Sequence, residues 1–386
     1  MSSKSRWLVF LVSTPLVIIA AVGGLLARQG VPPRAIRELG VFDDVVSLVV
    51  SSYVERVDVD KVMEGAMRGL AEGLDASSAY LSAEEVKAIE ANSPLPAGDV
   101  GLVVSRQFYL RVVGVRDGSP GARAGLRTGD FIRGIEGHPT RDTSAFTGNR
   151  LLRGAPGTKV ELIVLRGSAV EPHTVSLTRE APKGPLVTSK RLPAGEGYLR
   201  VVSFNTGAAA GIRKEIDSLK GAGATSAIID LRGVADGPIS EGIAAARHFV
   251  KVGALATLGG RSGTKTVTSA SPGDGAVTMP IVLLVSNGTA YAAEMFAAAL
   301  SENQRADLVG EPTAGLAAAQ HLVRLPENRG LWMTYARYLT NDGKPIHEHG
   351  LRPAVAVEEP NVLFGETPPT VDEPLSRAIE RLKTRK

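Results

Sequence analysis

One turn in this sequence has the form that often holds a catalytic group. The apolar run PIVLLVS (280–286) is followed by NGTAYAAEM (287–295), which leads into an Ala-rich stretch. This order predicts a buried strand, a tight turn and a helix, and such turns can present a nucleophile at the start of the helix. The central side chain is Tyr291, a phenol with an ordinary pKa of about 10 that needs an adjacent base to act as a nucleophile.

Two hydroxyl groups near Tyr291 offer an alternative nucleophile. Thr289 and Ser286 precede it in the same turn. On a strand-to-helix turn, such a shift changes both the direction and the depth of the hydroxyl, and neither residue has a lysine partner that the sequence identifies. Catalysis by a displaced nucleophile, with Thr289 as the candidate, therefore stays open as an alternative.

Other polar residues do not form a convincing site. The segment IHEHG (346–350) brings His347 and His349 close together, but two ligands do not make a metal site, so we expect no metal. Asp230 and Arg232 follow the apolar run SAII, and we expect a buried ion pair there rather than a catalytic couple. No nucleotide fingerprint or phosphate loop is visible, and we expect no cofactor.

Composition limits the function classes. The chain has 386 residues, of which 44% are hydrophobic and 22% charged, as expected for a globular protein with roughly two or three domains. The net charge of +4 is small and the basic residues are scattered, so we expect no nucleic-acid partner. The absence of cysteine excludes disulfides, thiol catalysis and cysteine-ligated zinc.

The N-terminus predicts export. The run from Trp7 to Ala27 carries no charge and is long enough to cross a hydrocarbon core of about 30 Å as a helix. Lys4 and Arg6 would keep the short leader in the cytoplasm. We therefore expect residues 1–30 to be a signal anchor in a bacterial inner membrane, with periplasmic domains behind it. Whether the anchor is cleaved stays open.

The rest of the chain predicts an α+β multidomain protein. Apolar residues at helical spacing indicate an N-terminal helical segment over 31–92, in which Ser82 and Glu85 form a capping box. A Pro/Gly/Ala linker precedes a unit of short strands over 93–182. Strands alternating with helices over 183–362 predict a mixed sheet covered by helices, and a helical tail follows over 363–386.

The second unit resembles a PDZ domain. SPGARAGLRTGD followed by IRGIEG is similar to the PDZ signature. The resemblance implies that an extended peptide adds a strand and places its terminal carboxylate on the amides of a loop. That loop is Gly101, Leu102, Val103 and Val104, and Val103 stands where the pattern has a second glycine. The alternative is a PDZ fold used only as a spacer or lid.

The whole order of motifs resembles the carboxyl-terminal processing peptidases, also called tail-specific proteases. The motifs are GYLRVVSFN, AIIDLRG, VSNGTAYAAE, VGEPTAG and IHEHGLRPAVAVE. The resemblance implies a core of crotonase-like ββα units and a serine nucleophile deprotonated by a lysine, with a supporting glutamine. Aligned with those patterns, the serine position is Tyr291, the lysine position is Leu316, and only Gln320 remains.

The loop expected to stabilise an oxyanion also departs from the family pattern. It reads DLRGVADG, so that Gly233 and Gly237 flank a segment in which Asp236 replaces a glycine. The amide of Ala292, directly after Tyr291, would complete the hole. A carboxylate at 236 would repel negative charge, so we expect the nucleophile, the base and the oxyanion hole all to be impaired.

Three functions follow from these expectations. In the first, the protein is a pseudo-peptidase whose cleft and PDZ groove bind peptide or protein C-termini, an active protease paralogue or an envelope protein. In the second, it is an active serine-type C-terminal processing endopeptidase with a displaced nucleophile. In the third, it is a scaffold that does not use the cleft and acts through its helical segments. A homo-oligomer is compatible with each of them.

Overall fold

The computed structural model describes residues 33–91, 93–167, 171–367 and 369–385, so the predicted anchor at residues 1–30 lies outside the described residues. No helix within these ranges is long and apolar enough to cross a membrane. The chain divides into two compact units, residues 1–67 and 68–386, which we describe separately.

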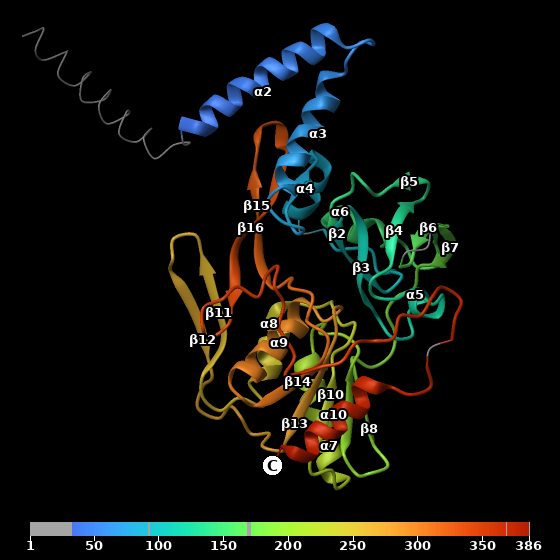
Figure 1. Ribbon diagram of the computed structural model, residues 1–386, viewed down its shortest axis with the longest axis vertical. Helices are drawn as coiled ribbons and strands as arrows, with labels where there is room; N and C mark the ends of the chain where they lie inside the picture. The colour runs from blue at the N-terminus through green and yellow to red at the C-terminus, as the bar shows by residue number, and fades with distance from the viewer. Residues whose placement is uncertain (1–32, 92, 168–170, 368, 386) are drawn as a thin grey trace, which may run out of the picture. The chain divides into compact units, whose positions relative to one another are not determined.

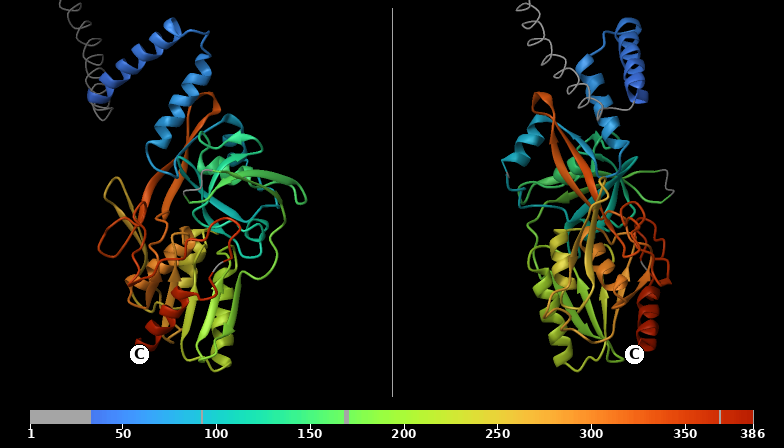
Figure 2. Two further views of the ribbon diagram at one scale, coloured as in Figure 1. Left: turned by 45° about the vertical axis from the view of Figure 1, so that its right-hand side comes forward. Right: turned by 90° about the vertical axis from the view of Figure 1, so that its left-hand side faces the viewer.

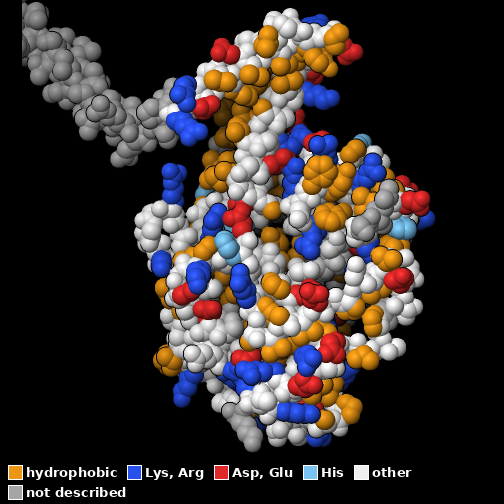
Figure 3. Space-filling view, viewed as in Figure 1, with side chains coloured by type: hydrophobic (Ala, Val, Ile, Leu, Met, Phe, Trp, Pro, Cys, Tyr) orange, Lys and Arg blue, Asp and Glu red, His pale blue; other side chains and the backbone are white. Residues whose placement is uncertain are grey.

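The described part of the first unit is helical, as the sequence predicts. It contains α2 (Pro33–Ser52) and the start of α3 (Val59–Glu72). Apolar side chains gather on the surface of α2 (Figure 3), where Leu39, Phe42, Val45 and Leu48 are all exposed. An amphipathic helix normally buries such residues against another element, so this surface remains without a partner in the described unit.

The second unit is built around a mixed sheet of six strands (Figure 1). Its order is β17-β14-β13-β10-β9-β8, and only the β8–β9 pair is antiparallel. The strands are β8 (Val187–Arg191), β9 (Gly197–Val201), β10 (Ala227–Asp230), β13 (Ile281–Val285), β14 (Ala306–Gly310) and β17 (Val355–Ala356). This confirms the mixed sheet predicted from the sequence.

Helices cover both faces of this sheet (Figure 2). They are α7 (Ala208–Gly221), α8 (Ile239–Ala246), α9 (Tyr291–Glu302) and α10 (Glu373–Thr384). Ile229 and Leu283 belong to the apolar core with α7 and α9, whereas Ile228 and Leu284 pack with α10. Because both faces are buried, the central strands are continuously apolar, which is why the sequence shows no alternation there.

The PDZ domain forms a second sheet of six strands, with order β2-β3-β4-β6-β7 and β5 beside β4. Its elements are β2 (Leu102–Gln107), β3 (Tyr109–Val115), α5 (Pro120–Arg123), β4 (Phe131–Ile135), β5 (His138–Pro139), α6 (Ala145–Leu151), β6 (Lys159–Leu165) and β7 (His173–Thr178). The short strands and two short helices agree with the prediction from the sequence.

A third, antiparallel sheet was not predicted. In it, β16 pairs with β15, β11 and β1, and β11 also pairs with β12. The strands are β1 (Ala79–Leu81), β11 (Ala254–Gly260), β12 (Lys265–Ser269), β15 (Ala318–Arg324) and β16 (Gly330–Leu339), and a short 3₁₀ turn η1 (Pro326–Asn328) joins β15 to β16. The segment 31–92 is therefore not wholly helical, because β1 joins this antiparallel sheet just before α4 (Ala83–Glu90).

Two local details of the second unit were predicted correctly. Ser82 caps α4, its hydroxyl accepting the Glu85 amide while the Glu85 carboxylate accepts the Ser82 amide. Asp230 and Arg232 form a buried ion pair, with 2.6 Å between Arg232 Nη2 and Asp230 Oδ2. Neither side chain lines the cavity described below, so we interpret this ion pair as structural.

The PDZ domain packs closely on the peptidase-type core. Arg200 on β9 makes two hydrogen bonds to Asp117 of the PDZ domain, at 2.8 and 2.9 Å. The Val115 amide donates to the Gly233 carbonyl at 3.2 Å. Gly288 lies so near the PDZ domain that a Cβ there would be 2.5 Å from the Val113 carbonyl oxygen. These contacts place the strands β2 and β3 directly over the turn that carries Tyr291.

Candidate functional site

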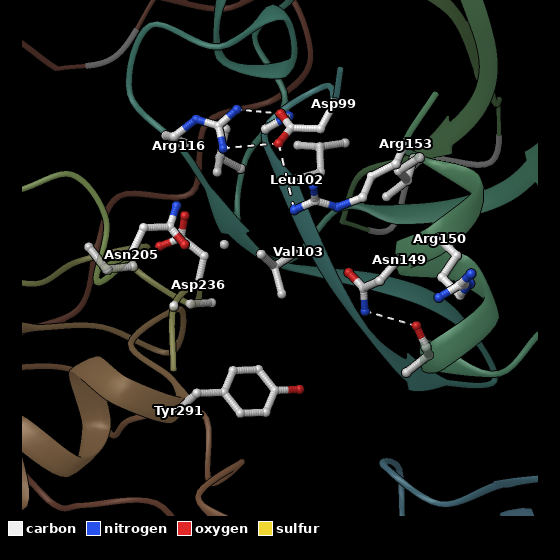
Figure 4. Close-up of a pocket in the computed structure, with 18 of the residues that line it drawn as sticks. Asp99, Leu102, Val103, Arg116, Asn149, Arg150, Arg153, Asn205, Asp236 and Tyr291 are labelled. Carbon is white, nitrogen blue, oxygen red and sulfur yellow. Dashed lines mark hydrogen bonds and ion pairs between the residues drawn. The ribbon is translucent and has the colours of Figure 1, made fainter. Parts of the chain in front are cut away.

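A cavity of about 360 Å³ lies between the PDZ domain and the core (Figure 4). On the PDZ side it is lined by β2, by α6 and by residues near Asp99. On the core side it is lined by the loop Gly233–Gly237, by Tyr291 and by Gln320. The structure therefore brings the two predicted sites, the PDZ loop and the peptidase turn, to one shared cleft.

Tyr291 is the first residue of α9 and has a strained backbone. Its φ is 49°, in the left-handed region, and Ala290 before it is extended. A non-glycine residue in this region costs on the order of 1–3 kcal/mol and is characteristic of functional turns. Figure 4 shows the tyrosine ring pointing from α9 toward β2 and α6. The turn thus has the shape predicted for a nucleophile, with a phenol in its place.

The environment of Tyr291 keeps the phenol neutral. Burial, with the nearby carboxylates of Glu294 and Asp75, raises the pKa of Tyr291 to about 12. A nucleophilic phenol needs a lowered pKa or an adjacent base. Burial and the two nearby carboxylates instead raise the pKa of Tyr291, so they oppose ionisation of the phenol.

Leu316 and Tyr291 lie in the same region of the structure. Both residues belong to one apolar cluster that also contains Val103 and Val113 of the PDZ domain. Leu316 is only 7% exposed, so its side chain fills the space where a base would stand. Positions 291 and 316 thus belong to one apolar cluster, in which the leucine has no group that could take a proton from the phenol.

Glu294 holds the loop that carries Leu316. Its Oε1 accepts the Gly315 amide at 2.8 Å and a hydrogen bond from Thr313, and its Oε2 accepts the Leu316 amide at 2.9 Å. The carboxyl is fully buried, and burial raises its pKa to about 7 although these hydrogen bonds oppose the rise. The main-chain scaffold of the site is therefore intact.

The alternative nucleophiles are committed to structural hydrogen bonds. Thr289 is completely buried, and its hydroxyl donates to the Leu231 carbonyl at 3.0 Å and accepts the Ser286 amide at 3.0 Å. The Ser286 hydroxyl accepts the amides of Gly233 and Gly288, each at 3.2 Å. Neither residue lines the cavity.

The loop predicted to form the oxyanion hole is present beside Tyr291. Gly233, Asp236 and Gly237 line the cavity, whereas Ala292 is completely buried in the core. Gly237 has φ of 88°, and a Cβ there would collide with the Phe204 carbonyl oxygen at 2.1 Å. Burial raises the pKa of Asp236, although the Ser203 hydroxyl and the Arg116 charge favour its ionised form.

Gln320 has a different neighbour from the one that the family resemblance implies. It lies on β15 and lines the cavity, and its Nε2 is 3.4 Å from Thr334 Oγ1 on β16. Because Leu316 offers no amine, Gln320 has no lysine to orient. Its polar group is available to a ligand in the cleft.

The segment IHEHG forms a turn at 347–349 rather than a strand, so His347 and His349 do not share a strand face. His347 is 1% exposed and lies 3.5 Å from Asp75 Oδ2. Burial acts to raise the pKa of Asp75, but hydrogen bonds from His347 and Thr334 outweigh it and hold the pKa well below its ordinary range. No group of three potential metal ligands occurs among the described residues.

Two amides of the PDZ loop donate hydrogen bonds to side chains of the protein. The Gly101 amide donates to Asp99 Oδ1 at 2.8 Å, and the Val104 amide donates to Asn149 Oδ1 at 3.0 Å. The Asn149 Nδ2 also donates to the Val104 carbonyl at 2.8 Å. Asn149 thus takes the place that one residue of an added peptide strand would occupy. Capture of a carboxylate by this loop stays a prediction.

Several lining residues were not identified from the sequence. They are Asn149, Phe146 and Arg150 on α6, Trp332 on β16, and Arg116 after β3. The rings of Phe146 and Trp332 contact each other in a tilted arrangement, with 5.5 Å between centroids, and join the PDZ helix to the β15–β16 ribbon. No local motif marks these residues. Only the place of α6 within the PDZ domain could have suggested that its side chains face a ligand.

Taken together, these groups line a cleft that can bind a ligand of mixed polar and apolar character. Extended backbone, aromatic rings, three arginines and two carboxylates surround a cavity large enough for several side chains. The described groups of the cleft do not form a nucleophile with a base. The oxyanion loop presents a carboxylate at the place where a negative charge would have to develop.

Comparisons with known proteins show which families this chain matches. Residues 195–357 match Peptidase family S41, and residues 111–166 match a PDZ domain. The carboxy-terminal processing protease CtpA of Bacillus subtilis (strain 168) is 31% identical over 316 residues, which is 81% of this chain and 67% of that protein. A carboxy-terminal-processing protease of Bartonella bacilliformis is 29% identical, covering 84% of this chain and 76% of that protein.

The fold comparison agrees. A solved structure described as photosystem II D1 C-terminal processing protease has a TM-score of 0.69 and 26% identity, over 87% of this chain and 95% of that one. The motif order, the cleft between the PDZ domain and the core, and these similarities lead to one conclusion. The chain belongs to Peptidase family S41, with the PDZ domain of the carboxy-terminal processing proteases.

Proposed function

We propose that this protein is a pseudo-peptidase that binds extended or C-terminal peptides, or the C-terminus of a partner protein, in the cleft between its PDZ domain and its core. The observation that carries the proposal is that Tyr291 and Leu316, which align with the family's serine and lysine, belong to one apolar cluster. A neutral phenol with a raised pKa beside a leucine cannot generate the alkoxide or phenolate that attack on a peptide bond requires.

Binding is supported over a purely structural role by the cleft itself. The cavity of about 360 Å³ is lined by polar groups and aromatic rings from both domains. The backbone strain at Tyr291 persists although the catalytic pair is replaced. Such strain is retained where the surrounding structure needs it, and here it directs the ring into the cleft.

The displaced-nucleophile alternative has less support. The Thr289 hydroxyl is buried and donates to the Leu231 carbonyl, so it faces the core and not the cavity. Attack by Thr289 would require breaking that hydrogen bond and rotating a stiff β-branched side chain. The structure offers no base at Leu316 for either hydroxyl.

The experiment combines activity with binding. Purified protein is incubated with an unfolded substrate protein and, separately, with a serine-reactive fluorophosphonate, while fluorescent peptides with free C-termini are titrated and followed by anisotropy. We expect no cleavage, no labelling and saturable binding. Cleavage or labelling that disappears in Thr289→Ala would establish the displaced nucleophile instead, and absence of peptide binding would refute the binding role.

The location and partners follow from the sequence. We propose a bacterial inner-membrane protein anchored through residues 7–27, with residues after Arg28 in the periplasm. Digestion of spheroplasts with an external protease should then remove the PDZ region, and its protection would contradict this location. Partners are peptide or protein C-termini, among them an envelope protein or an active protease paralogue.

A homo-oligomer is a further proposal. It is supported by the exposed apolar residues of α2, which a second copy could cover. Light scattering on the chain without residues 1–30 should give a mass above that of a monomer. The mass should fall when Phe42 and Val45 are both replaced by glutamate.

A further inference from the structure

The core side of the cleft holds a buried acceptor that lacks a partner. Asp236 lines the cavity between Asn205 and Tyr291 (Figure 4), and its Oδ1 is buried without a hydrogen-bond partner among the described residues. An unsatisfied buried carboxylate oxygen is unfavourable, because the atom has lost its water and gained nothing in exchange. A donor supplied by a ligand would remove that cost.

Among the residues that the structure describes, the charge that acts on Asp236 is that of Arg116. Arg116 is close enough to influence Asp236, but its guanidinium is bound to Asp99, with 3.2 Å between Nη1 and Oδ2. The arginines that line the described cavity, Arg116, Arg150 and Arg153, all come from the PDZ domain. On the core side, the position of the family's lysine is the apolar Leu316.

The surroundings of Tyr291 are correspondingly negative. The carboxylates of Asp75 and Glu294 both act on the phenol, and Asp236 lies on the same side of the cavity. The face of an aromatic ring attracts cations, more strongly where water is excluded. A carboxylate oxygen and a ring face beside one cavity form a common arrangement for binding a basic side chain.

We propose that the core side of the cleft binds a basic side chain, lysine or arginine, of an extended peptide ligand, with Asp236 Oδ1 accepting its hydrogen bond and the Tyr291 ring contacting its charge. This inference rests on the proposed peptide-binding function and adds the chemical class of one residue in the ligand. The incoming cation supplies a positive charge on the core side of the cleft, where Asp236 lines the cavity. Asp236 is then the specificity-determining residue, and the carboxylate that disfavours an oxyanion has a positive role in binding.

The test is a comparison of matched peptides. Fluorescent decapeptides of alanine and leucine with a free C-terminus carry one lysine at each position in turn, and a second series carries norleucine at the same positions. Both series are titrated into the full-length chain in detergent micelles and followed by anisotropy. At one position, we expect lysine to bind about ten- to a hundredfold more tightly than norleucine, as a hydrogen bond between charged groups allows.

Variants assign the preference to its residues. Asp236→Asn keeps the shape of the side chain but removes its charge, and it should abolish most of the lysine advantage while the affinity for norleucine peptides changes less than about twofold. Tyr291→Phe should retain the advantage because the ring face remains, whereas Tyr291→Leu should reduce it several-fold. Asp217→Asn is the matched control, because Asp217 is an exposed carboxylate on α7 paired with Arg213.

Each outcome decides between distinct conclusions. If lysine and norleucine peptides bind equally at every position, the basic-residue site is wrong while the peptide-binding function stands. If the lysine advantage survives Asp236→Asn, or is lost equally in Asp217→Asn, Asp236 is not the acceptor and the proposal is overturned. If no peptide of either series binds, the proposed function itself fails. A thermal unfolding curve for each variant separates loss of binding from loss of folding.

Discussion

The Glu294 carboxylate and the Leu316 amide are hydrogen-bonded at 2.9 Å. Because Glu294 lies one turn after Tyr291 on α9, this bond fixes the loop at the lysine position to the helix at the serine position. The two positions of the catalytic pair are therefore held together by a main-chain scaffold that does not depend on the side chains at 291 and 316.

That scaffold predicts that chemistry can be restored by side-chain replacement. The double variant Tyr291→Ser with Leu316→Lys supplies a hydroxyl on the strained turn and an amine at position 316. Gln320, which lines the same cavity, follows on β15. We expect slow cleavage of an unfolded protein substrate and fluorophosphonate labelling from the double variant only. Either single variant leaves half of the pair missing and should stay inactive.

The remaining barrier is Asp236, whose charge opposes an oxyanion. Loss of one oxyanion donor typically costs about a hundred- to a thousandfold in rate, so adding Asp236→Gly to the double variant should raise the activity further. Activity in the wild-type chain that persists in Tyr291→Phe after repurification would show that the nucleophile lies elsewhere.

A second prediction concerns the role of Thr289. Thr289→Val removes a buried hydroxyl that bonds to the Leu231 carbonyl and the Ser286 amide, so the free energy of unfolding should fall by about 1–3 kcal/mol. Urea denaturation measures this change. Peptide affinity should be unaltered, because Thr289 does not line the cavity. Thr289→Ser, which keeps the hydroxyl, should recover most of the stability, and equal losses in both variants would contradict the hydrogen-bonding role.

A third prediction uses the raised pKa of Glu294. Its folded-state pKa is about 7, against an ordinary value of 4.5. Between these values the folded protein holds a proton that the unfolded chain has released, so the free energy of unfolding must fall as the pH rises through this window. The contribution of the protonated Glu294 carboxyl to the free energy of unfolding is fully present below about pH 4.5 and is lost by about pH 7. It amounts to at most about 3 kcal/mol.

Glu294→Gln provides the measurement. The glutamine cannot ionise, so its unfolding free energy should be flatter between pH 4.5 and 7 than that of the wild type. The difference between the two curves isolates this carboxyl from groups such as Asp75, whose lowered pKa acts at lower pH with the opposite sign. Parallel curves for the two proteins would mean that Glu294 is ionised throughout.

A fourth prediction concerns the PDZ strand edge. Asn149→Ala frees the amide and carbonyl of Val104, so a C-terminal peptide can add one more residue to β2, and its affinity should increase several-fold. Anisotropy titrations with free and amidated peptides measure the gain and its dependence on the terminal charge. Phe146→Leu, a variant of another lining residue on α6, should not increase affinity. A loss of affinity in Asn149→Ala would mean that Asn149 contacts the ligand rather than blocking it.

Much of this protein could be predicted from its sequence because the signals are local. A strand-turn-helix pattern locates Tyr291, a nearby loop motif locates Leu316, and Ser82 with Glu85 marks the start of a helix. Continuous apolar runs identify the strands buried on both faces. The sequence did not reveal the antiparallel sheet, because β1 pairs with β16 far along the chain and the register of that pairing leaves no local pattern.

The sequence by itself thus determined the family, and it predicts the replacement of the catalytic pair. Only the tertiary structure decided what the remaining groups do. The Thr289 hydroxyl is taken by Leu231, which lies 58 residues away in the chain, and Val104 is capped by Asn149 at a separation of 45 residues. The unpaired oxygen of Asp236 likewise depends on everything packed around it. The availability of a polar atom is decided by the neighbours that folding brings to it, and those neighbours are not adjacent in sequence.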